Sequence, residues 1–290
     1  MALAQAKRYL DQAAEIPSMK LVSLTGGEPF LSFDSLVHLV SYASKLGFSV
    51  ECITNCLWAK DHEVAEQKLR ALTNAGLSII NISADDFHQE YIPFERVKNC
   101  YEVAKRLELR IVILCVTYRK SKFRLRNVIN MLGNDGIFIL EKGVDPRLLA
   151  NHNIIAIESG FIPAGRGAKI AKEDIITTED PPFGPCEHIV RDTAIDPTGK
   201  LFPCCSGAGS TQPLLIEDAN KKPLFEAIEQ ANGNKLVKLL ATEGPHKLFE
   251  KLSEQGLIKQ LDRHVDKCHL CYDMLSNPVV QRTVFQVLSI

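Results

Sequence analysis

The sequence lacks an excess of charge of either sign, a long hydrophobic run, and any cysteine in its first 25 residues. Its 34 basic and 35 acidic side chains leave a net charge of -1, which gives no basis for binding nucleic acid or an anionic membrane surface. No apolar run approaches the roughly 18 residues that span a bilayer. The first ten residues also lack the apolar stretch of a secretory signal. We therefore expect a cytoplasmic protein with neither a nucleic-acid nor a membrane partner.

Nine cysteines occur further along the chain. Their number is odd, and disulfides are rare in the reducing cytosol. Metal binding is therefore a better prediction for these thiols than a disulfide framework.

Short apolar runs alternate with helix-like segments at intervals of about 30 residues, a pattern typical of an α/β fold with parallel strands. The runs are near-continuous, as expected of strands buried on both faces. An open doubly wound sheet and a barrel both fit this alternation, and both place functional residues at the carboxyl ends of the strands. The predicted strands are residues 20–24, 48–53, 77–82, 110–117 and 153–157.

The pattern changes after about residue 170. Residues 179–185 are acidic and proline-rich, which predicts a linker. Residues 193–203 predict a hairpin that turns at residues 196–199. Helices are expected at residues 224–231, 235–240 and 246–254. We therefore predict two domains, residues 1–175 and residues 176–290, of which the second is a small α+β domain.

Polar and glycine residues follow three of the predicted strands. The first strand leads into Thr25–Pro29, the second into Thr54 and Asn55, and the third into residues 83–86. Gly26 and Gly27 leave the backbone open to a ligand, and the Glu28 carboxylate can hold an ammonium group. Each segment alone is compatible with a simple turn. Together, on one rim of the sheet, they predict a small-molecule pocket.

The segment Leu24–Pro29 resembles the Gly-Gly-Glu-Pro motif of radical S-adenosylmethionine (SAM) enzymes. In that family this strand end binds the amino group of the SAM methionine. Cys56, after the second polar strand end, stands where the family often has glycine. Residues 83–85 resemble the family's Ser-x-Asp segment near the SAM ribose and carboxylate, and residues 163–166 resemble its Gly-Arg segment. The resemblance implies that SAM is bound by Gly26, Gly27, Glu28, Thr54, Asn55, Ser83, Asp85 and Arg166.

One family feature is missing ahead of this motif. Radical SAM enzymes hold a catalytic [4Fe–4S] cluster with Cys-x3-Cys-x2-Cys after the first barrel strand. Cys52 and Cys56 have the first spacing, but they lie downstream, and Ala59 occupies the third position. The resemblance therefore implies a partial (β/α)6 TIM-like barrel that lacks its first strand and has no catalytic cluster. We interpret the sequence as truncated (an internal start, a fragment or a disrupted gene) rather than as a natural pseudoenzyme.

A second group of cysteines lies near the end of the chain. Twelve residues separate Cys186 from Gly199, and four separate Gly199 from Cys204. Cys268 and Cys271 form a Cys-x2-Cys pair, which two thiolates on one tight turn can use to chelate a metal. The predicted hairpin brings Cys186 and Cys204 to its two ends. Four thiolates suit either a [4Fe–4S] cluster or a structural zinc ion.

This cysteine layout resembles the twitch domain of radical SAM enzymes, the half-size relative of the SPASM domain. The resemblance implies one auxiliary [4Fe–4S] cluster held by Cys186, Cys204, Cys268 and Cys271. Cys205 is the alternative to Cys204.

The resemblance as a whole implies an enzyme that cleaves SAM reductively to a 5′-deoxyadenosyl radical and modifies a peptide or a small molecule. Its partners would include an electron donor such as a flavodoxin or ferredoxin. Activity of this chain stays open because the catalytic cysteines are absent. The alternative is a non-catalytic iron–sulfur or zinc protein that uses the partial barrel as a binding module.

Overall fold

The computed structural model describes residues 1–134, 136–141, 149, 151–178, 182–259 and 263–289. These residues form two compact units, Ala2–Ser159 and Gly160–Ile290. The sequence predicts a domain boundary after residue 175. In the structure, residues 160–175 group with the later unit. The division at 175 stays a prediction. Part of the expected linker at 179–185 lies outside the described residues.

The first unit contains a six-stranded parallel sheet with the strand order β1-β2-β3-β4-β6-β5. The α/β class and the five expected strands are confirmed. The strand at 138–140 was not expected, because three residues carry too little pattern to predict. Closure into a TIM-like barrel stays a prediction. The strands are β1 (Leu21–Leu24), β2 (Ser49–Thr54), β3 (Leu77–Ser83), β4 (Arg110–Val116), β5 (Phe138–Leu140) and β6 (Ile154–Ser159).

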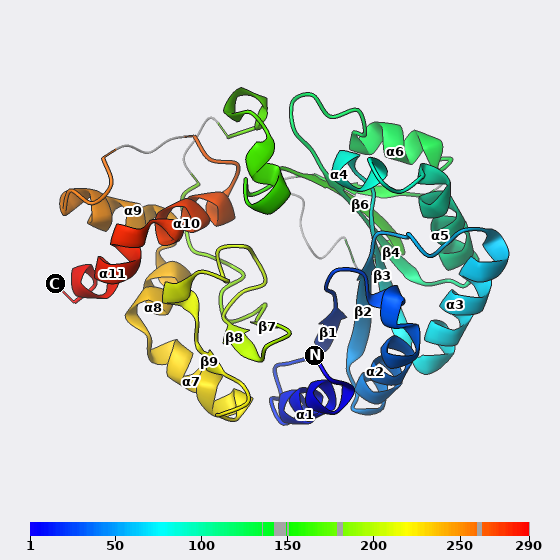
Figure 1. Cartoon of the computed structure of the whole chain (residues 1–290), viewed down its shortest axis with the longest axis horizontal. Helices are drawn as coiled ribbons and strands as arrows, with labels where there is room; N and C mark the ends of the chain where they lie inside the picture. The colour runs from blue at the N-terminus through cyan, green and yellow to red at the C-terminus, as the bar shows by residue number, and fades with distance from the viewer. Residues whose placement is uncertain (135, 142–148, 150, 179–181, 260–262, 290) are drawn as a thin grey trace. The chain divides into compact units, whose positions relative to one another are not determined.

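Helices of this unit pack along one face of the sheet, where α2, α3 and α5 follow one another across β2, β3 and β4 (Figure 1). This arrangement is the crossover geometry that parallel strands require. The helices are α1 (Leu3–Ala14), η1 (Pro29–Ser32), α2 (Phe33–Lys45), α3 (His62–Ala75), α4 (Asp86–Gln89), α5 (Phe94–Arg106) and α6 (Leu125–Met131).

The two faces of the sheet differ in burial. Buried and half-buried residues alternate along β2 and β4. Cys52 of β2 pairs with Ile80 of β3, which pairs with Ile111 of β4, and all three side chains are fully buried on one face of the sheet. The residues between them, such as Ile53 and Val112, are only half-buried. The expectation that both faces are buried is therefore wrong for these central strands, and one face remains partly accessible.

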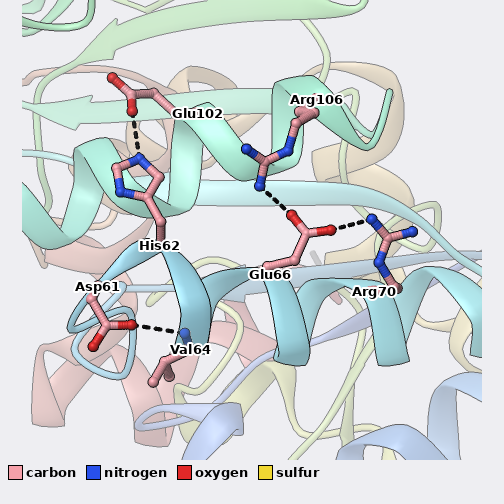
Figure 2. Close-up of polar contacts among 7 residues, drawn as sticks. All are labelled: Asp61, His62, Val64, Glu66, Arg70, Glu102 and Arg106. Carbon is pink, nitrogen blue, oxygen red and sulfur yellow. Dashed lines mark hydrogen bonds and ion pairs between the residues drawn. The ribbon is translucent and has the colours of Figure 1, made fainter.

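Charged side chains link α3 to α5 on the surface (Figure 2). Glu66 pairs with Arg70 of its own helix and with Arg106 of α5. His62 lies 2.7 Å from the Glu102 carboxylate, a second contact between the same helices. Asp61 caps the start of α3, because its Oδ1 accepts a hydrogen bond of 2.8 Å from Val64 N. The charged contacts join α3 to α5, which both pack against β3.

The second unit confirms the expected hairpin. Strands β7 and β8 pair antiparallel around the turn at 196–199, and β9 adds a third strand that the sequence did not predict. Asp196 holds the turn, because its carboxylate accepts hydrogen bonds from the backbone N–H groups of Thr198 and Lys200. Its other elements are η3 (Gly165–Lys169), η4 (Lys172–Asp174), β7 (Ala194–Ile195), β8 (Lys200–Phe202), η5 (Gln212–Leu214), β9 (Glu217–Asp218), α7 (Leu224–Gly233), α8 (Lys235–Thr242), α9 (Pro245–Glu254), α10 (Lys267–Ser276) and α11 (Pro278–Val287).

A helical core stabilises this second unit. Helices α8 to α11 contact one another through fully buried aliphatic residues such as Leu236, Leu248 and Val284. Cys271 and Ile189 belong to the same cluster of buried residues. The core therefore lies directly against the cysteines expected to bind metal. No helix within the described ranges is both long enough and apolar enough to span a membrane.

Candidate functional site

The segment that follows β1 leaves its backbone accessible. Thr25, Gly26 and Gly27 are exposed. Gly26 has a φ of +148°, in a region that side chains rarely adopt, and a Cβ at either glycine would meet no atom within 4 Å. A ligand can therefore approach the main chain here without displacing a side chain.

Glu28 joins this segment to the end of β2. Its Oε1 accepts hydrogen bonds from Thr54 Oγ1 at 2.9 Å and from Phe30 N at 3.2 Å, and its Oε2 accepts one from Asn55 N at 2.8 Å. The expectation that these two strand ends lie on one rim is supported by direct contacts between their residues. The half-buried Glu28 is thereby fixed in orientation.

Thr54 makes three hydrogen bonds through its hydroxyl. The Thr54 hydroxyl donates to Glu28 and accepts hydrogen bonds from Cys56 N at 3.0 Å and Trp58 Nε1 at 2.9 Å. The Trp58 ring stacks on Phe30 with centroids 3.9 Å apart and planes only 5° from parallel. Sequence reasoning gave Trp58 no role, because only the fold brings it to Thr54 and Phe30.

Burial raises the pKa of Glu28 above its usual value of 4.5, although hydrogen bonds from Asn55, Phe30 and Thr54 and the charge of His88 act in the opposite direction. The ionised form of the Glu28 carboxylate is therefore less stable here than it is in water. A positively charged group placed beside it would favour ionisation and be bound in return.

Cys56 adopts the left-handed backbone conformation, with a φ of +63°. Glycine adopts that conformation most easily, which gives a physical reason for the glycine that radical SAM enzymes often have here. The Cys56 thiol is fully buried, and its pKa is raised by burial and by a hydrogen bond with Cys100. This position packs into the interior and is a poor candidate for a metal ligand.

Ser83 is the last residue of β3 and Asp85 follows the strand, where it has partners of its own. The Asp85 side chain is almost fully buried, and its Oδ1 contacts His88 Nδ1 at 2.9 Å. The same oxygen accepts a hydrogen bond of 3.2 Å from His88 N and so caps the short helix α4. Asp85 therefore orients His88, a residue to which the sequence assigned no role. The predicted contact of Asp85 with SAM stays a prediction.

Arg166 belongs to the other compact unit, in η3. Its side chain is exposed, and the neighbouring Gly167 is buried against the Phe161 ring. The structure does not place the two units relative to each other. The expected role of Arg166 in SAM binding therefore stays a prediction.

The four C-terminal cysteines lie together. Cys186, Cys204, Cys268 and Cys271 line one small pocket. The sequence predicted this grouping although Cys186 and Cys271 are far apart in the chain. Cys268 and Cys271 lie in the first turns of α10 rather than on the tight turn expected, and Asp266 caps that helix through His269 N at 2.8 Å. Cys205 is exposed and does not line the pocket.

Local contacts position the two cysteines outside α10. Cys186 N donates to Leu240 O at 2.8 Å, and Lys267 Nζ donates to Pro185 O at 2.7 Å, so α8 and α10 both hold this loop. Cys204 follows β8 and is buried, and Gly209 packs so closely that a Cβ on it would lie 2.8 Å from Cys204 Sγ. The α8–α10 helices and the hairpin thus converge on the thiols.

Burial raises the pKa of Cys204 and Cys271, and raises that of Cys268 to about 12. The nearby thiols raise these pKa values further. Buried thiols of this kind become thiolates when a metal replaces their protons, and four thiolates are a donor set for iron–sulfur clusters or zinc. Within the described ranges, no three His, Cys, Asp or Glu side chains are spaced to hold a single metal ion.

Ser206 is a polar pocket residue that the sequence did not single out. Its hydroxyl lies 3.5 Å from Cys204 Sγ, and it lines the pocket beside the four thiols. Its only sequence signal is its position two residues after Cys204.

The chain is similar to several known proteins at low sequence identity. Over 265 residues the chain is 20% identical to YydG of Bacillus subtilis (strain 168), a protein assigned by name to peptide biosynthesis, with 91% of this chain and 79% of YydG covered. A dihydrodipicolinate synthase family protein from Coccidioides immitis is 15% identical, with a TM-score of 0.35, and covers 61% of this chain. The match spans 60% of that structure, less than two thirds of it. A monomeric dihydrodipicolinate synthase variant is 13% identical, with a TM-score of 0.36, over 98% of this chain and 92% of its own.

The family match concerns the first unit. It begins at the first residue and ends at residue 127, so it includes the rim formed by Glu28, Thr54 and Asp85. Residues 1–127 match the Radical SAM superfamily.

Proposed function

We propose that this chain binds SAM at the rim formed by the ends of β1, β2 and β3. The observation that carries the proposal is the Glu28 carboxylate, which is half-buried, held by three hydrogen bonds and raised in pKa. The match of residues 1–127 to the Radical SAM superfamily supports the same assignment. The proposed SAM-binding residues of this rim are Gly26, Gly27, Glu28, Thr54, Asn55, Ser83 and Asp85, and Arg166 stays a separate prediction from the sequence.

An ammonium group is the ligand chemistry that suits Glu28. Its carboxylate loses hydration on burial, and a ligand ammonium replaces that hydration with a charge-assisted hydrogen bond. The open backbone at Gly26 and Gly27 gives the methionine end of SAM a path to this carboxylate. Ser83 and Asp85 extend the same rim toward the ribose and carboxylate of SAM.

The second part of the proposal is an auxiliary [4Fe–4S] cluster on Cys186, Cys204, Cys268 and Cys271, in a twitch-like domain. These thiols line one pocket and provide the soft donors that such a cluster needs. The cluster would accept or donate an electron during modification of the substrate. A zinc ion is the alternative occupant, and Cys205 is the alternative ligand to Cys204.

The proposed reaction class is radical modification of a substrate. In that class, SAM bound to a reduced [4Fe–4S] cluster supplies a 5′-deoxyadenosyl radical. The 290 residues nowhere contain Cys-x3-Cys-x2-Cys, so the proposal assigns SAM binding to this chain and leaves SAM cleavage to be tested. The similarity to YydG favours a peptide over a small molecule as substrate. A flavodoxin or ferredoxin in the cytoplasm would supply the electrons.

Calorimetric titration with SAM tests the first site. We expect binding to the wild-type chain, at least tenfold weaker binding to the Glu28→Gln variant, and unchanged binding to Glu63→Gln, a variant at an exposed position of α3. Equal affinities for all three chains, or no binding by the wild type at millimolar SAM, would overturn the proposal.

Metal analysis after anaerobic reconstitution tests the second site. We expect about four iron atoms per chain, as one [4Fe–4S] cluster contains. The Cys268→Ala variant should lose them, whereas Cys205→Ala should keep them. If the protein is colourless and binds one zinc ion through Cys268, the site holds zinc instead of a cluster.

A second candidate function is a non-catalytic SAM-binding iron–sulfur protein. The absence of Cys-x3-Cys-x2-Cys from the sequence favours it. Incubation of the reconstituted protein with SAM and dithionite separates the two functions. Formation of 5′-deoxyadenosine supports an enzyme, and unchanged SAM supports the binding protein.

A further inference from the structure

Ser206 lies in the loop that follows β8 and reaches into the pocket of the four cysteines. Its side chain is half-buried, and its hydroxyl oxygen is 3.5 Å from Cys204 Sγ, within hydrogen-bonding distance for sulfur. The hydroxyl is therefore placed beside a proposed metal ligand rather than toward open solvent.

Cys268 of α10 lines the same pocket as Ser206 and Cys204, so Ser206 lies among thiols from two separate segments. A hydroxyl that donates to a ligand sulfur stabilises the thiolate, which is the form that binds metal.

The surrounding loop holds Ser206 in this position. Gly209 N donates to Ser206 O at 2.9 Å and closes a tight turn. The next hydroxyl in the loop, on Ser210, turns away and donates to Gly207 O at 2.8 Å. Ser210 is exposed and does not line the pocket of the thiols, so it provides a matched control.

We propose that Ser206 is a positioning residue of the four-cysteine site, and that its hydroxyl raises the reduction potential of the cluster bound there. The inference rests on the proposed auxiliary cluster. A hydrogen bond donated to a ligand sulfur draws electron density from the cluster and stabilises the reduced form, which carries the additional negative charge. The hydroxyl has one hydrogen, which it can direct to Cys204 Sγ.

Redox titration followed by electron paramagnetic resonance tests this role in four reconstituted proteins: wild type, Ser206→Ala, Ser206→Thr and Ser210→Ala. We expect equal iron contents. At the wild-type midpoint, the reduced-to-oxidised ratio in Ser206→Ala should fall at least about threefold, which corresponds to a shift of about -28 mV for one electron. Ser206→Thr, which retains a hydroxyl, and Ser210→Ala should stay at the wild-type midpoint.

Each other outcome has a distinct meaning. An unchanged midpoint in Ser206→Ala, with the wild-type iron content, overturns the role of Ser206 and leaves the proposed cluster intact. Loss of iron from Ser206→Ala would show that Ser206 is necessary for cluster assembly. It would overturn the proposed effect of Ser206 on the reduction potential. A wild-type chain that binds zinc alone or no metal overturns the proposed cluster, and the role of Ser206 falls with it.

Discussion

The Thr54 hydroxyl donates a hydrogen bond of 2.9 Å to the Glu28 carboxylate, and this bond joins the ends of two adjacent parallel strands through side chains. The same hydroxyl accepts hydrogen bonds from Cys56 N and Trp58 Nε1, so its bonding capacity is used fully. A residue at the centre of three such bonds contributes to stability and to the orientation of Glu28 at once.

Replacing Thr54 by valine keeps the shape of this residue and removes its hydroxyl. Glu28 loses a donor, and the buried N–H of Trp58 loses its acceptor. We expect the free energy of unfolding to fall by about 1–3 kcal/mol, the typical cost of leaving buried polar groups unsatisfied. Urea denaturation measures this change. Thr73→Val is the control, because that hydroxyl donates to Leu69 O within its own helix. Equal losses in the two variants would remove the special role of Thr54.

The raised pKa of Glu28 predicts how stability depends on pH. The folded chain holds the Glu28 proton more tightly than the unfolded chain does, because burial disfavours the carboxylate. This contribution is complete below the usual value of 4.5 and is lost as the pH rises through the higher folded value. The wild type should therefore lose stability relative to Glu28→Gln as the pH rises from about 4 to 7. Urea denaturation across that range measures the difference, and a relative gain would contradict the prediction.

Binding of SAM should favour the ionised form of Glu28. A SAM ammonium group beside Glu28 favours the carboxylate and lowers its pKa, so protons are released when SAM binds in the pH range just above 4.5. Calorimetry in buffers of different ionisation enthalpy counts the protons. Glu28→Gln should release none.

The periodicity of the sequence predicted the elements well where the apolar runs are long. Four of the five expected strands match β1 to β4, and the fifth matches β6 within two residues. The three-residue β5 was missed, because its place beside β6 depends on pairing rather than on its own pattern. The Cys-x2-Cys spacing predicted a chelating pair but not its location, since cysteines three apart also share one face of a helix such as α10.

The candidate site was predictable only in part. Glu28, Thr54 and Asn55 could be grouped because parallel strand ends meet at one rim. The pairing of Asp85 with His88 could not, because the same Ser-x-Asp sequence is compatible with a ligand contact or a helix cap. Ser206 was missed because a hydroxyl near a cysteine has no distinctive spacing, and its place in the pocket of the four thiols exists only in the folded chain.

The ion pairs around Glu66 should have a small, salt-dependent effect. Arg106 and Arg70 lower the pKa of Glu66, so their contribution is present above its usual value of 4.5 and is lost as the pH falls through the lower folded value. Glu66→Gln should lower the melting temperature slightly at pH 7. Because the pairs are exposed, this difference should shrink in 1 M salt and vanish at low pH. A difference insensitive to salt would show that packing, not charge, carries the contact between α3 and α5.

Gly209 should be necessary for the four-cysteine site, although it carries no side chain. A Cβ at this position would lie 2.3 Å from Cys204 O and 2.8 Å from Cys204 Sγ, distances that require the cysteine to move. Gly209→Ala should therefore destabilise the chain by about 1–3 kcal/mol, as overpacking does, and reduce the iron bound after reconstitution. Gly207→Ala is the matched control, because a Cβ there meets Ile162 at an ordinary 3.5 Å. If Gly209→Ala binds as much iron as Gly207→Ala, Cys204 has room to shift without leaving the metal. Cys204 would then remain the ligand, and Gly209 would not be necessary for the site.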